Sequence, residues 1–528
     1  MNSEAVDLSS VEREKTLIDS LLHESVYPHP ADNIRLLETH ISWVILTGSF
    51  AYKVKKPIKL EFLDFSSLER RKHFCDEELR LNRRWAPDIY LDVVPICGSF
   101  EEPRIGGTGS PIEYAVKMVQ FPQSAQLDAQ LDAGLLVDGD MDELAEMIAD
   151  RHASAAVCAR LDAADAVELV QHPMLENIEH LKLHVSRDEL QGPAAWTGKK
   201  LRELWATVIQ RQDDGFIREC HGDLHLRNLV RLPSGIAAFD CVEFSAELRD
   251  IDVISDAAFL MMDLIARGRQ DLGYLFINRY LECTGDYPGM SVFGLYYVYH
   301  ALIRAKIAAI QSVERTNEAD RHRDQEEIAH YCSVARRWIA PRRPCLVAMH
   351  GFSGSGKTWL SQQLLSRLPA IRVRSDIERK RLYGLRETEK SGASVGKGIY
   401  DPRARTGIYG ALADAAETLL RLGQHVIVDA SFLNRDDRQL FQILANRLDA
   451  DFVIVAARAE PDELRRRVQI RQRDVRDASE ADTDVLQYQY EHADPLVAEE
   501  LEWTIDVATD ADIDADRIVE QIVAARRS

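Results

Sequence analysis

Two stretches of the sequence combine residue types that suit phosphate chemistry. The first reads HGDLHLRN over residues 221–228 and is followed twelve residues later by Asp240. The second reads GFSGSGKT over residues 351–358. Phosphoryl transfer needs a carboxylate that orients the acceptor hydroxyl, together with oxygen ligands for the Mg²⁺ ion on the nucleotide phosphates. The first stretch offers these groups, and the second offers the glycines and the lysine that wrap a phosphate.

In the first stretch, Asp223 lies five residues before Asn228, and Asp240 follows a predicted hairpin with strands at 228–232 and 236–239. Asp223 is therefore the predicted catalytic base. Asn228 and Asp240 are the predicted Mg²⁺ ligands, since their oxygen atoms are hard donors on a rigid hairpin. The alternative is an ordinary turn-rich loop, because Asp and Asn favour turns in any protein. Asp252 and Asp256 fall one helical turn apart at a predicted helix start, and we predict that they cap the helix and form a structural ion pair with Arg249.

The HGDLHLRN sequence with its downstream aspartate resembles the aminoglycoside phosphotransferase (choline-kinase-like) family. The resemblance implies a protein-kinase-like fold, in which a strand lysine paired with a helix glutamate holds the ATP phosphates. Lys53 is the predicted lysine, and Lys55 on the same strand face is the alternative. Glu78 is preferred to its neighbour Glu77, because Glu78 shares a helix face with apolar residues.

The second stretch follows an apolar run at 345–349 and opens a predicted helix, which is the context that a P-loop requires. Thr358 is a predicted Mg²⁺ ligand, and so is Asp429 at the end of the apolar run 425–428. The alternative is a chance glycine-rich loop. The residues predicted to bind the nucleotide phosphates are Gly351, Ser353, Gly354, Ser355, Gly356, Lys357 and Thr358.

Residues 341–528 resemble the gluconate kinase/zeta-toxin-like branch of P-loop kinases, which implies a small hydroxylated acceptor. Asp376 follows a predicted strand at 371–374, where such kinases place an acceptor-binding or base carboxylate. The arginine-rich run 464–473 resembles a lid that closes on phosphates. Arg467 and Arg471 share a helix face and are its predicted inward pair. A solvated charged helix is the alternative interpretation.

The elements that must position these residues change character along the chain. Strands are predicted at 43–46, 51–55, 90–96 and 112–121, with a helix at 66–85 that begins at the capping residue Ser66. Residues 140–210 and 251–340 are mostly helical. Prolines at 341 and 344 precede an alternation of strands and helices, which implies a parallel α/β sheet. The predicted fold is α/β and α+β multidomain, with a β-rich N-lobe at 1–125, a helical C-lobe at 126–340 and a P-loop domain at 341–528.

Composition narrows the class of partner. The 528 residues carry a formal net charge of −21, which argues against non-specific binding to nucleic acid or anionic membrane. The eight cysteines include no C-x-x-C pair, and no uncharged run is long enough for a membrane span. The acidic start of the chain does not resemble a signal peptide. We therefore expect a cytoplasmic protein.

The whole chain is similar to the bacterial fusion family known as bifunctional aminoglycoside phosphotransferase/ATP-binding protein. The resemblance implies ATP as phosphate donor, with GTP as an open alternative, and Mg²⁺ as cofactor. The acceptor would be a hydroxyl of a small molecule such as an aminoglycoside, sugar or polyol, whose identity the sequence leaves open. Two further hypotheses are a P-loop half that regulates one active kinase, and a toxin-type kinase acting on a nucleotide-sugar. The sequence does not indicate an oligomeric state.

Overall fold

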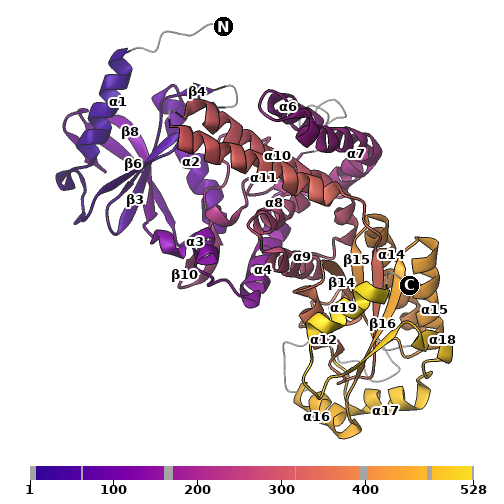
Figure 1. Cartoon of the computed structure of the whole chain (residues 1–528). Helices are drawn as coiled ribbons and strands as arrows, with labels where there is room; N and C mark the ends of the chain where they lie inside the picture. The colour runs from indigo at the N-terminus through magenta and orange to yellow at the C-terminus, as the bar shows by residue number, and fades with distance from the viewer. Residues whose placement is uncertain are drawn as a thin grey trace. The chain divides into compact units, whose positions relative to one another are not determined.

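The structure is a computed structural model, and it describes residues 8–60, 63–159, 170–315, 317–391, 402–471 and 479–525 (Figure 1). Contacts divide the chain into two compact units. The first unit contains Met1–Leu136, Asp150–Arg160 and Arg211–Asp256, and the second contains Val137–Ala149, Leu161–Gln210 and Ala257–Ser528. The domain limits expected at 125/126 and 340/341 stay a prediction.

A six-stranded antiparallel sheet in the order β1-β2-β3-β8-β6-β7 forms the β-rich part of the first unit. The sequence predicted four of these strands and missed the short edge strands β1 and β7. Interior strand β3 is separated from β2 by only three residues, as expected for a hairpin. The strands are β1 Arg35–Glu38, β2 Ser42–Leu46, β3 Phe50–Lys55, β6 Tyr90–Gly98, β7 Pro103–Ile105 and β8 Pro111–Val119.

Helix α2 (Leu68–Trp85) packs against β6 and β8. Its N-cap is Ser67, whose Oγ accepts a hydrogen bond from the Arg70 amide at 3.3 Å. The predicted cap, Ser66, is wrong by one residue, because its hydroxyl donates to Asp64 Oδ1 at 2.6 Å instead. The buried face of α2 includes Glu78 and Asn82, two polar side chains among apolar ones. Buried polar side chains require hydrogen-bond or ion-pair partners. The partners of Glu78 and Asn82 belong to the first candidate site.

Two small antiparallel pairs frame the HGDLHLRN segment in the first unit. Strand β9 (Ile217–Glu219) pairs with β12 (Asp250–Asp252), and β10 (Leu229–Leu232) pairs with β11 (Gly235–Ala238) across a two-residue turn. The segment leaves β9 and enters β10, so that its two ends are fixed by strand pairing. Helix α8 (Val253–Ala266) begins directly after β12.

The second unit contains a helical part and a parallel sheet. Among the helices, α10 and α11 pack side by side, and Trp338 of α11 stacks on Tyr297 of α10 with ring centroids 4.2 Å apart (Figure 1). No described helix combines the length and apolarity that crossing a membrane requires. Helices that lie wholly or partly in this unit are α4 Asp138–Ser154, α6 His172–Leu181, α7 Arg187–Asp213, α9 Gln270–Thr284, α10 Met290–Glu314 and α11 Glu318–Ile339.

The parallel sheet has five strands in the order β14-β15-β13-β16-β17, all parallel to their neighbours. The central strands are buried apolar runs, as expected for a sheet covered by helices on both faces. The strands are β13 Cys345–His350, β14 Ala370–Arg374, β15 His425–Asp429, β16 Asp451–Arg458 and β17 Thr504–Ala508. The helices are α12 Lys357–Leu365, α13 Ser375–Leu382, α14 Pro402–Arg421, α15 Arg435–Arg447, α16 Pro461–Arg471, α17 Thr483–His492, α18 Ala498–Leu501 and α19 Ala515–Ala525.

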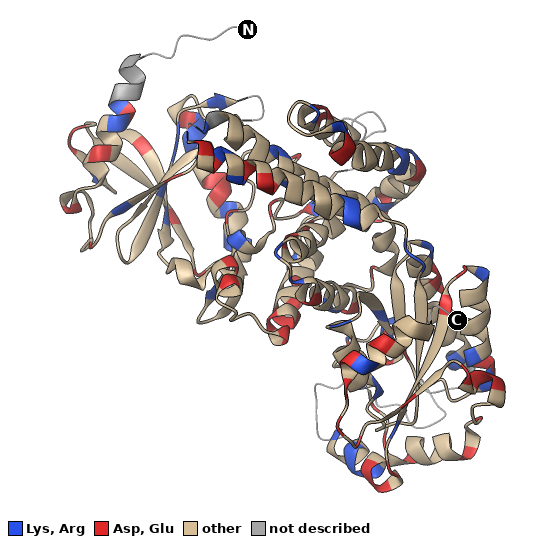
Figure 2. Ribbon diagram, viewed as in Figure 1, with Lys and Arg blue, Asp and Glu red and all other residues tan. Residues whose placement is uncertain are grey.

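The predicted fold class is confirmed: a β-rich lobe and helices precede a parallel α/β sheet that carries the P-loop. Figure 2 shows basic and acidic residues interspersed along the ribbon in both units, and not gathered in one segment. The net charge of −21 is therefore spread over the molecule.

Two candidate active sites

Asp223 and Asn228 lie together in the first unit. The Asn228 amide Nδ2 donates to Asp223 Oδ2 at 2.9 Å and to the Asp223 carbonyl at 3.0 Å. His225 Nε2 lies 3.5 Å from the other carboxylate oxygen, Oδ1. The Asp223 side chain is still 43% exposed, so an acceptor hydroxyl can reach its carboxylate while the loop holds it in one orientation.

His221 connects this loop to the segment that carries Asp240. Its Nδ1 accepts from the Asp223 amide at 3.3 Å, and its Nε2 lies 3.0 Å from the Phe239 carbonyl. Burial lowers the pKa of His221, which favours the neutral ring with its one proton on Nε2, facing the carbonyl oxygen. The histidine therefore links the loop at 221–228 to the end of the hairpin.

Asp240 lies just past the hairpin, in a backbone conformation that side chains rarely adopt, with φ of 63°. Such a residue persists only when its surroundings hold it. The Tyr90 hydroxyl accepts from the Asp240 amide at 3.1 Å, and Asn82 Oδ1 accepts from the Cys241 amide at 2.9 Å. These two buried partners fix the direction of a carboxylate that is 47% exposed. No local sequence pattern indicates either partner.

The hairpin register brings the two predicted metal ligands to one end of the hairpin. The Phe239 amide donates to the Asn228 carbonyl at 2.9 Å, directly beyond the strand pair Leu229 and Ala238. Asn228 and Asp240 therefore both lie at the end of the hairpin that is opposite its turn. Carboxylate and amide oxygens are the donors that Mg²⁺ prefers, so these residues fit the ion that the resemblance implies.

Lys53 joins the helix glutamate to the candidate metal ligand. Its Nζ lies 2.8 Å from Glu78 Oε1 and 2.5 Å from Asp240 Oδ1. Lys55 lies deeper: its side chain is fully buried, with Nζ 2.8 Å from Glu78 Oε2 and an ion pair to Glu243. The neighbouring Glu77 pairs with Arg80 on the outer side of the helix. The structure thus brings Lys53, Glu78 and Asp240 together and leaves Glu77 outside the site.

The second lysine has its own carboxylate, which sequence reasoning missed. Burial raises the pKa of Glu243 although Lys55 acts in the opposite direction. Burial alone would lower the pKa of Lys55, but Glu243 and Glu78 outweigh burial and raise it. Lys55 therefore stays charged, and its role is to balance the two buried glutamates.

Asp256 is a second residue whose role the sequence missed. Its carboxylate accepts from the backbone amides of His221 at 2.8 Å and Gly222 at 3.1 Å, from inside α8. Burial raises the pKa of Asp256, but His152 and His221 outweigh it and hold the pKa below its usual value. The expected capping role is confirmed for Asp252, whose Oδ1 accepts from the Ile254 amide at 3.1 Å. The expected partner Arg249 is wrong, because Asp252 forms its ion pair with Arg211, and Asp256 lies 3.4 Å from His152 Nε2. Asp256 orients the start of the catalytic loop, a contact over 35 positions of sequence that no local pattern reveals.

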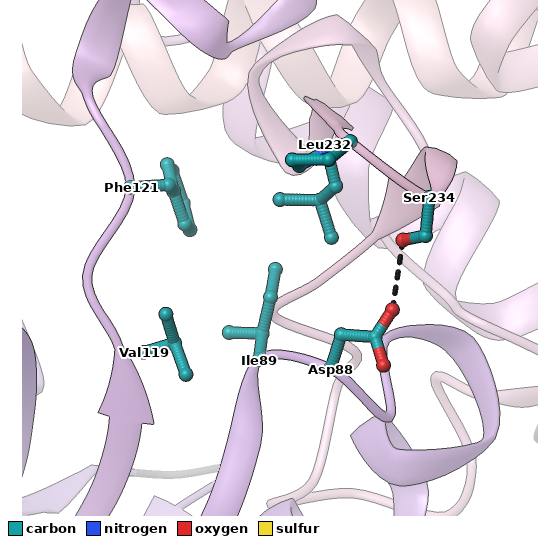
Figure 3. Close-up of a pocket in the computed structure, with 7 residues that line it drawn as sticks. Asp88, Ile89, Val119, Phe121, Leu232 and Ser234 are labelled. Atoms are coloured by element: carbon teal, nitrogen blue, oxygen red, sulfur yellow. Dashed lines mark hydrogen bonds between the residues drawn. The ribbon is translucent and has the colours of Figure 1, made fainter.

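A largely apolar pocket of about 290 Å³ lies beside the segment at 121–123 that follows β8 (Figure 3). The Ser234 hydroxyl donates to Asp88 Oδ2 at 2.7 Å on one side of it. Because none of the phosphate-binding candidates lines this pocket, we assign it no role in phosphate transfer. Its lining residues are Asp88, Ile89, Val119, Phe121, Leu232, Pro233 and Ser234.

In the second unit, the P-loop wraps the end of its own lysine. Lys357 Nζ donates to the Gly351 carbonyl at 2.8 Å and to the Phe352 carbonyl at 2.9 Å. Burial, with a smaller effect of Arg471, outweighs the opposing effect of Asp429 and Asp376 and lowers the pKa of Lys357 to about 8. The loop therefore presents a lysine whose charge an anionic phosphate would stabilise.

The P-loop contains glycines where the backbone of other segments lies too close for a side chain. Gly354 has φ of 82°, and a Cβ there would lie 2.6 Å from the Leu464 carbonyl. Gly351 has φ of 147°, and a Cβ there would lie 2.4 Å from the Ala457 carbonyl. The predicted serines also belong to this loop: Ser353 donates its amide to Gln489 Oε1 at 2.8 Å, and Thr509 donates its hydroxyl to the Ser355 carbonyl at 2.7 Å.

Thr358 and Asp429 are linked through one serine of α12. Ser361 Oγ lies 2.9 Å from the Thr358 carbonyl and 3.5 Å from Asp429 Oδ2. Asp429 ends β15 and is 5% exposed, whereas Thr358 is exposed at the start of the helix. A hydroxyl and a carboxylate beside a P-loop are oxygen donors that fit Mg²⁺.

Asp376 lies in the first turn of α13, with Arg379 Nη1 3.1 Å from its Oδ1. Burial raises the pKa of Asp376, but Arg379 and Arg471 outweigh burial and lower the pKa overall. The carboxylate is therefore ionised at neutral pH. It also acts on the pKa of Lys357, which places the acceptor candidate within electrostatic range of the P-loop.

The two predicted lid arginines have different surroundings. Arg467 donates to the Thr509 hydroxyl at 2.9 Å and to the Thr509 carbonyl at 2.8 Å, so it ties α16 to the loop after β17. Arg471 acts on the pKa values of Lys357 and Asp376. Arg467 Nη1 also donates to the Gly354 carbonyl of the P-loop at 3.4 Å. Both arginines therefore lie at the P-loop, and Arg471 is the one that acts on the P-loop lysine and the acceptor candidate. Residues 472 and 473 of the predicted lid lie outside the described residues.

Comparison with known proteins gives three further findings. The AAA_33 family, described as an AAA domain, matches residues 346–496, a range that contains the whole second site. An uncharacterized protein of Mycobacterium tuberculosis is 29% identical over 430 residues, which is 80% of this chain and 83% of the relative.

Two solved structures are similar to different parts of the chain. Choline kinase from Cryptosporidium parvum is 12% identical, covers 63% of this chain and 96% of its own, and has a TM-score of 0.36. A gluconokinase from Sinorhizobium meliloti is 18% identical, covers 35% of this chain and 94% of its own, and has a TM-score of 0.25. The family match and the geometry of the sites support a nucleotide-dependent phosphotransferase. Membership of the predicted fusion family stays a prediction.

Proposed function

We propose that this chain is an ATP-dependent phosphotransferase with two kinase-type sites. Each site would transfer the γ-phosphate to a hydroxyl of a small molecule. The observation that carries the proposal is the contact of Lys53 with both Glu78 and Asp240, next to the exposed carboxylate of Asp223. A lysine, an oxygen-donor pair and an accessible base are the groups that phosphoryl transfer to an alcohol requires.

In the first site, Asp223 orients the acceptor hydroxyl and takes its proton. The hydroxyl oxygen forms a bond to the γ-phosphorus while the bond to the bridging oxygen of ADP breaks. Lys53 holds the nucleotide phosphates, and Glu78 keeps the lysine extended towards them. Mg²⁺, held by Asn228 and Asp240, would neutralise charge on the phosphates.

In the second site, Lys357 and the amides of the P-loop hold the nucleotide phosphates. Asp376 orients the acceptor, since its lowered pKa keeps the carboxylate ionised and able to accept a hydroxyl proton in a hydrogen bond. Arg471 adds positive charge near the transferred group. Thr358 and Asp429 are the residues that would hold Mg²⁺. ATP is the proposed donor at both sites, with GTP as the alternative.

A second candidate is that the P-loop half binds nucleotide and regulates the other site without transferring phosphate. Lys357 favours this candidate in one respect, because its amine is engaged with two carbonyls of its own loop. Nucleotide binding must break these bonds, and a change of loop conformation could be transmitted through the second unit.

The test is an ADP-release screen over sugars, polyols, nucleosides and aminoglycosides, with ATP and then GTP. The wild-type chain is compared with Asp223→Ala and with Lys357→Ala. Acceptors whose turnover is lost in only one variant are assigned to that site. If Lys357→Ala changes no turnover but alters the nucleotide dependence of the first site, the regulatory candidate replaces the second kinase. If both variants match the wild type for every acceptor, the proposal is wrong.

A further inference from the structure

Strand β14 lies at an edge of the parallel sheet, and helix α9 packs against it (Figure 1). Asn278 Nδ2 donates to the Ala370 carbonyl at 2.9 Å, and Asn278 Oδ1 accepts from the Arg372 amide at 2.5 Å. An exposed sheet edge normally leaves such groups unpaired. Here a buried amide from outside the P-loop domain pairs them, so α9 is bonded specifically to this strand.

Glu282 lies one turn after Asn278 on the same helix and meets the two arginines of the strand. Its Oε1 accepts from Arg372 Nε at 3.0 Å and Nη2 at 2.7 Å, and its Oε2 accepts from Arg374 Nη1 at 3.3 Å. The glutamate side chain is 2% exposed. Burial raises the pKa of Glu282, but Arg372 and Arg374 outweigh burial and lower the pKa to about 2. The carboxylate is therefore a permanent charge that both arginines share.

The same two arginines reach the residues that would hold Mg²⁺. Arg372 Nη1 donates to Ser361 Oγ at 3.0 Å, and this hydroxyl lies 3.5 Å from Asp429 Oδ2. Arg374 Nε lies 4.0 Å from the same oxygen of Asp429. Arg374 Nη1 also lies 3.5 Å from Glu387 Oε1. Arg374 thus stands between Asp429 on β15 and two other carboxylates, of which Glu282 on α9 is the more buried, with 2% of its side chain exposed against 20% for Glu387. Only Asp429 is needed by a metal ion.

We infer that Glu282 is a positioning residue of the P-loop site, which draws Arg374 away from Asp429 and so leaves that carboxylate available to Mg²⁺. The inference rests on the proposed nucleotide-binding function of this site. Without the charge of Glu282, Arg374 pairs with Asp429 and competes with the metal ion. The P-loop site therefore depends on a helix that lies upstream of the prolines at 341 and 344.

The experiment measures nucleotide binding, not turnover. The full-length chain carries Lys53→Met, which removes the lysine of the first site, and is titrated with the non-hydrolysable ATP analogue AMPPNP with and without Mg²⁺. Glu282→Gln is expected to weaken binding about tenfold with Mg²⁺, as outer residues of metal sites do, while metal-free binding stays within about twofold. Adding Arg374→Gln to Glu282→Gln is expected to restore most of the lost affinity, because the competing cation is gone.

Glu146→Gln is the matched control. Glu146 on α4 pairs with Arg279 of α9 at 2.7 Å, and within the described part of the chain it forms no hydrogen bond or ion pair with Arg372 or Arg374. This variant should leave both affinities unchanged. If Glu282→Gln does not fold, Arg374→Gln alone provides the test, since the inference predicts that its Mg²⁺-dependent affinity is equal to or higher than that of the parent.

Three outcomes contradict the inference. They are equal losses with and without Mg²⁺, absence of recovery in the double variant, and reduced Mg²⁺-dependent affinity in Arg374→Gln alone. Each would show that Glu282 only stabilises packing. Failure of the proposed function has a different signature: the parent chain would then show no binding that Lys357→Ala abolishes, and the inference would fall with it.

Discussion

Lys53 Nζ lies 2.5 Å from Asp240 Oδ1, so a buried strand lysine contacts the candidate metal ligand directly. In this structure the positive charge of Lys53 compensates the negative charge of Asp240. With nucleotide bound, Mg²⁺ would compensate the charge of Asp240, and the phosphates would compensate the charge of Lys53. Lys55, two residues along the same strand, pairs instead with the buried carboxylates of Glu78 and Glu243. The two lysines of one strand face therefore have separable roles.

Substitution should separate these roles. Lys53→Met is expected to lower kcat/KM at the first site about 10²- to 10³-fold, because one preorganised cationic contact to the phosphates is lost. Lys55→Met is expected to reduce the free energy of unfolding by about 3 to 5 kcal/mol, because two buried carboxylates lose their cation. Steady-state kinetics and urea unfolding measure both effects. The assignment would be contradicted if Lys53→Met and Lys55→Met lost the same activity and had the same free energy of unfolding.

The substitution Asp223→Asn should remove the proposed catalytic base without changing the conformation of its loop. The amide has the size of the carboxylate and can still contact Asn228, which lies 2.9 Å away. Turnover of first-site acceptors should fall about 10²- to 10⁴-fold, the usual contribution of a general base. Nucleotide binding should change less than about threefold, since Asp223 is not assigned to the phosphates. Calorimetric titration with AMPPNP is the check, and a parallel loss of binding would argue for a structural role.

Local patterns predicted the parts of the molecule that depend on neighbouring residues. The P-loop, the hairpin that carries Asn228, and the parallel sheet all follow from spacing and periodicity. Tyr90, Asn82 and Asp256 were not predicted, because each acts through a hydrogen bond to a backbone amide far along the chain.

Contacts between residues far apart in the sequence also decide the roles of the two lid arginines and of the two strand lysines. Arg467 and Arg471 share a helix face, yet only the fold shows that Arg467 is engaged by Thr509. Strand alternation placed Lys53 and Lys55 on one face, and it could not rank them. Their order depends on which carboxylates the hairpin supplies, and that is a property of tertiary structure.

The lowered pKa of Lys357 predicts a pH dependence for the second site. With a pKa of about 8 in the folded protein, the lysine loses its charge as the pH rises above about 8. A phosphate prefers the protonated form, so AMPPNP affinity should fall steadily between about pH 8 and pH 10 and should be constant below pH 7. Proton uptake on binding should accompany this fall.

Lys357→Arg is the control for that pH profile. Arginine keeps its charge throughout this range, so its AMPPNP affinity, even if lower overall, should be independent of pH up to about pH 10. A second consequence concerns stability. Between the folded pKa of about 8 and the usual value near 10.5, the unfolded chain binds more protons, so the contribution of Lys357 to stability rises with pH. A profile shared by both proteins would assign the effect to another group.

Gly354→Ala tests the close approach on which the P-loop depends. The backbone there has φ of 82°, and the added Cβ would lie 2.6 Å from the Leu464 carbonyl, a backbone atom that has no side-chain freedom to withdraw. The left-handed conformation alone costs an alanine about 1 to 2 kcal/mol, so the loop should shift and AMPPNP binding at this site should be lost. Gly410→Ala is the control, because Gly410 lies inside α14 with open space around it. That variant should bind normally and gain about 0.5 to 1 kcal/mol in unfolding free energy. Normal binding by Gly354→Ala would show that the loop accepts a side chain there and does not hold phosphate through its backbone.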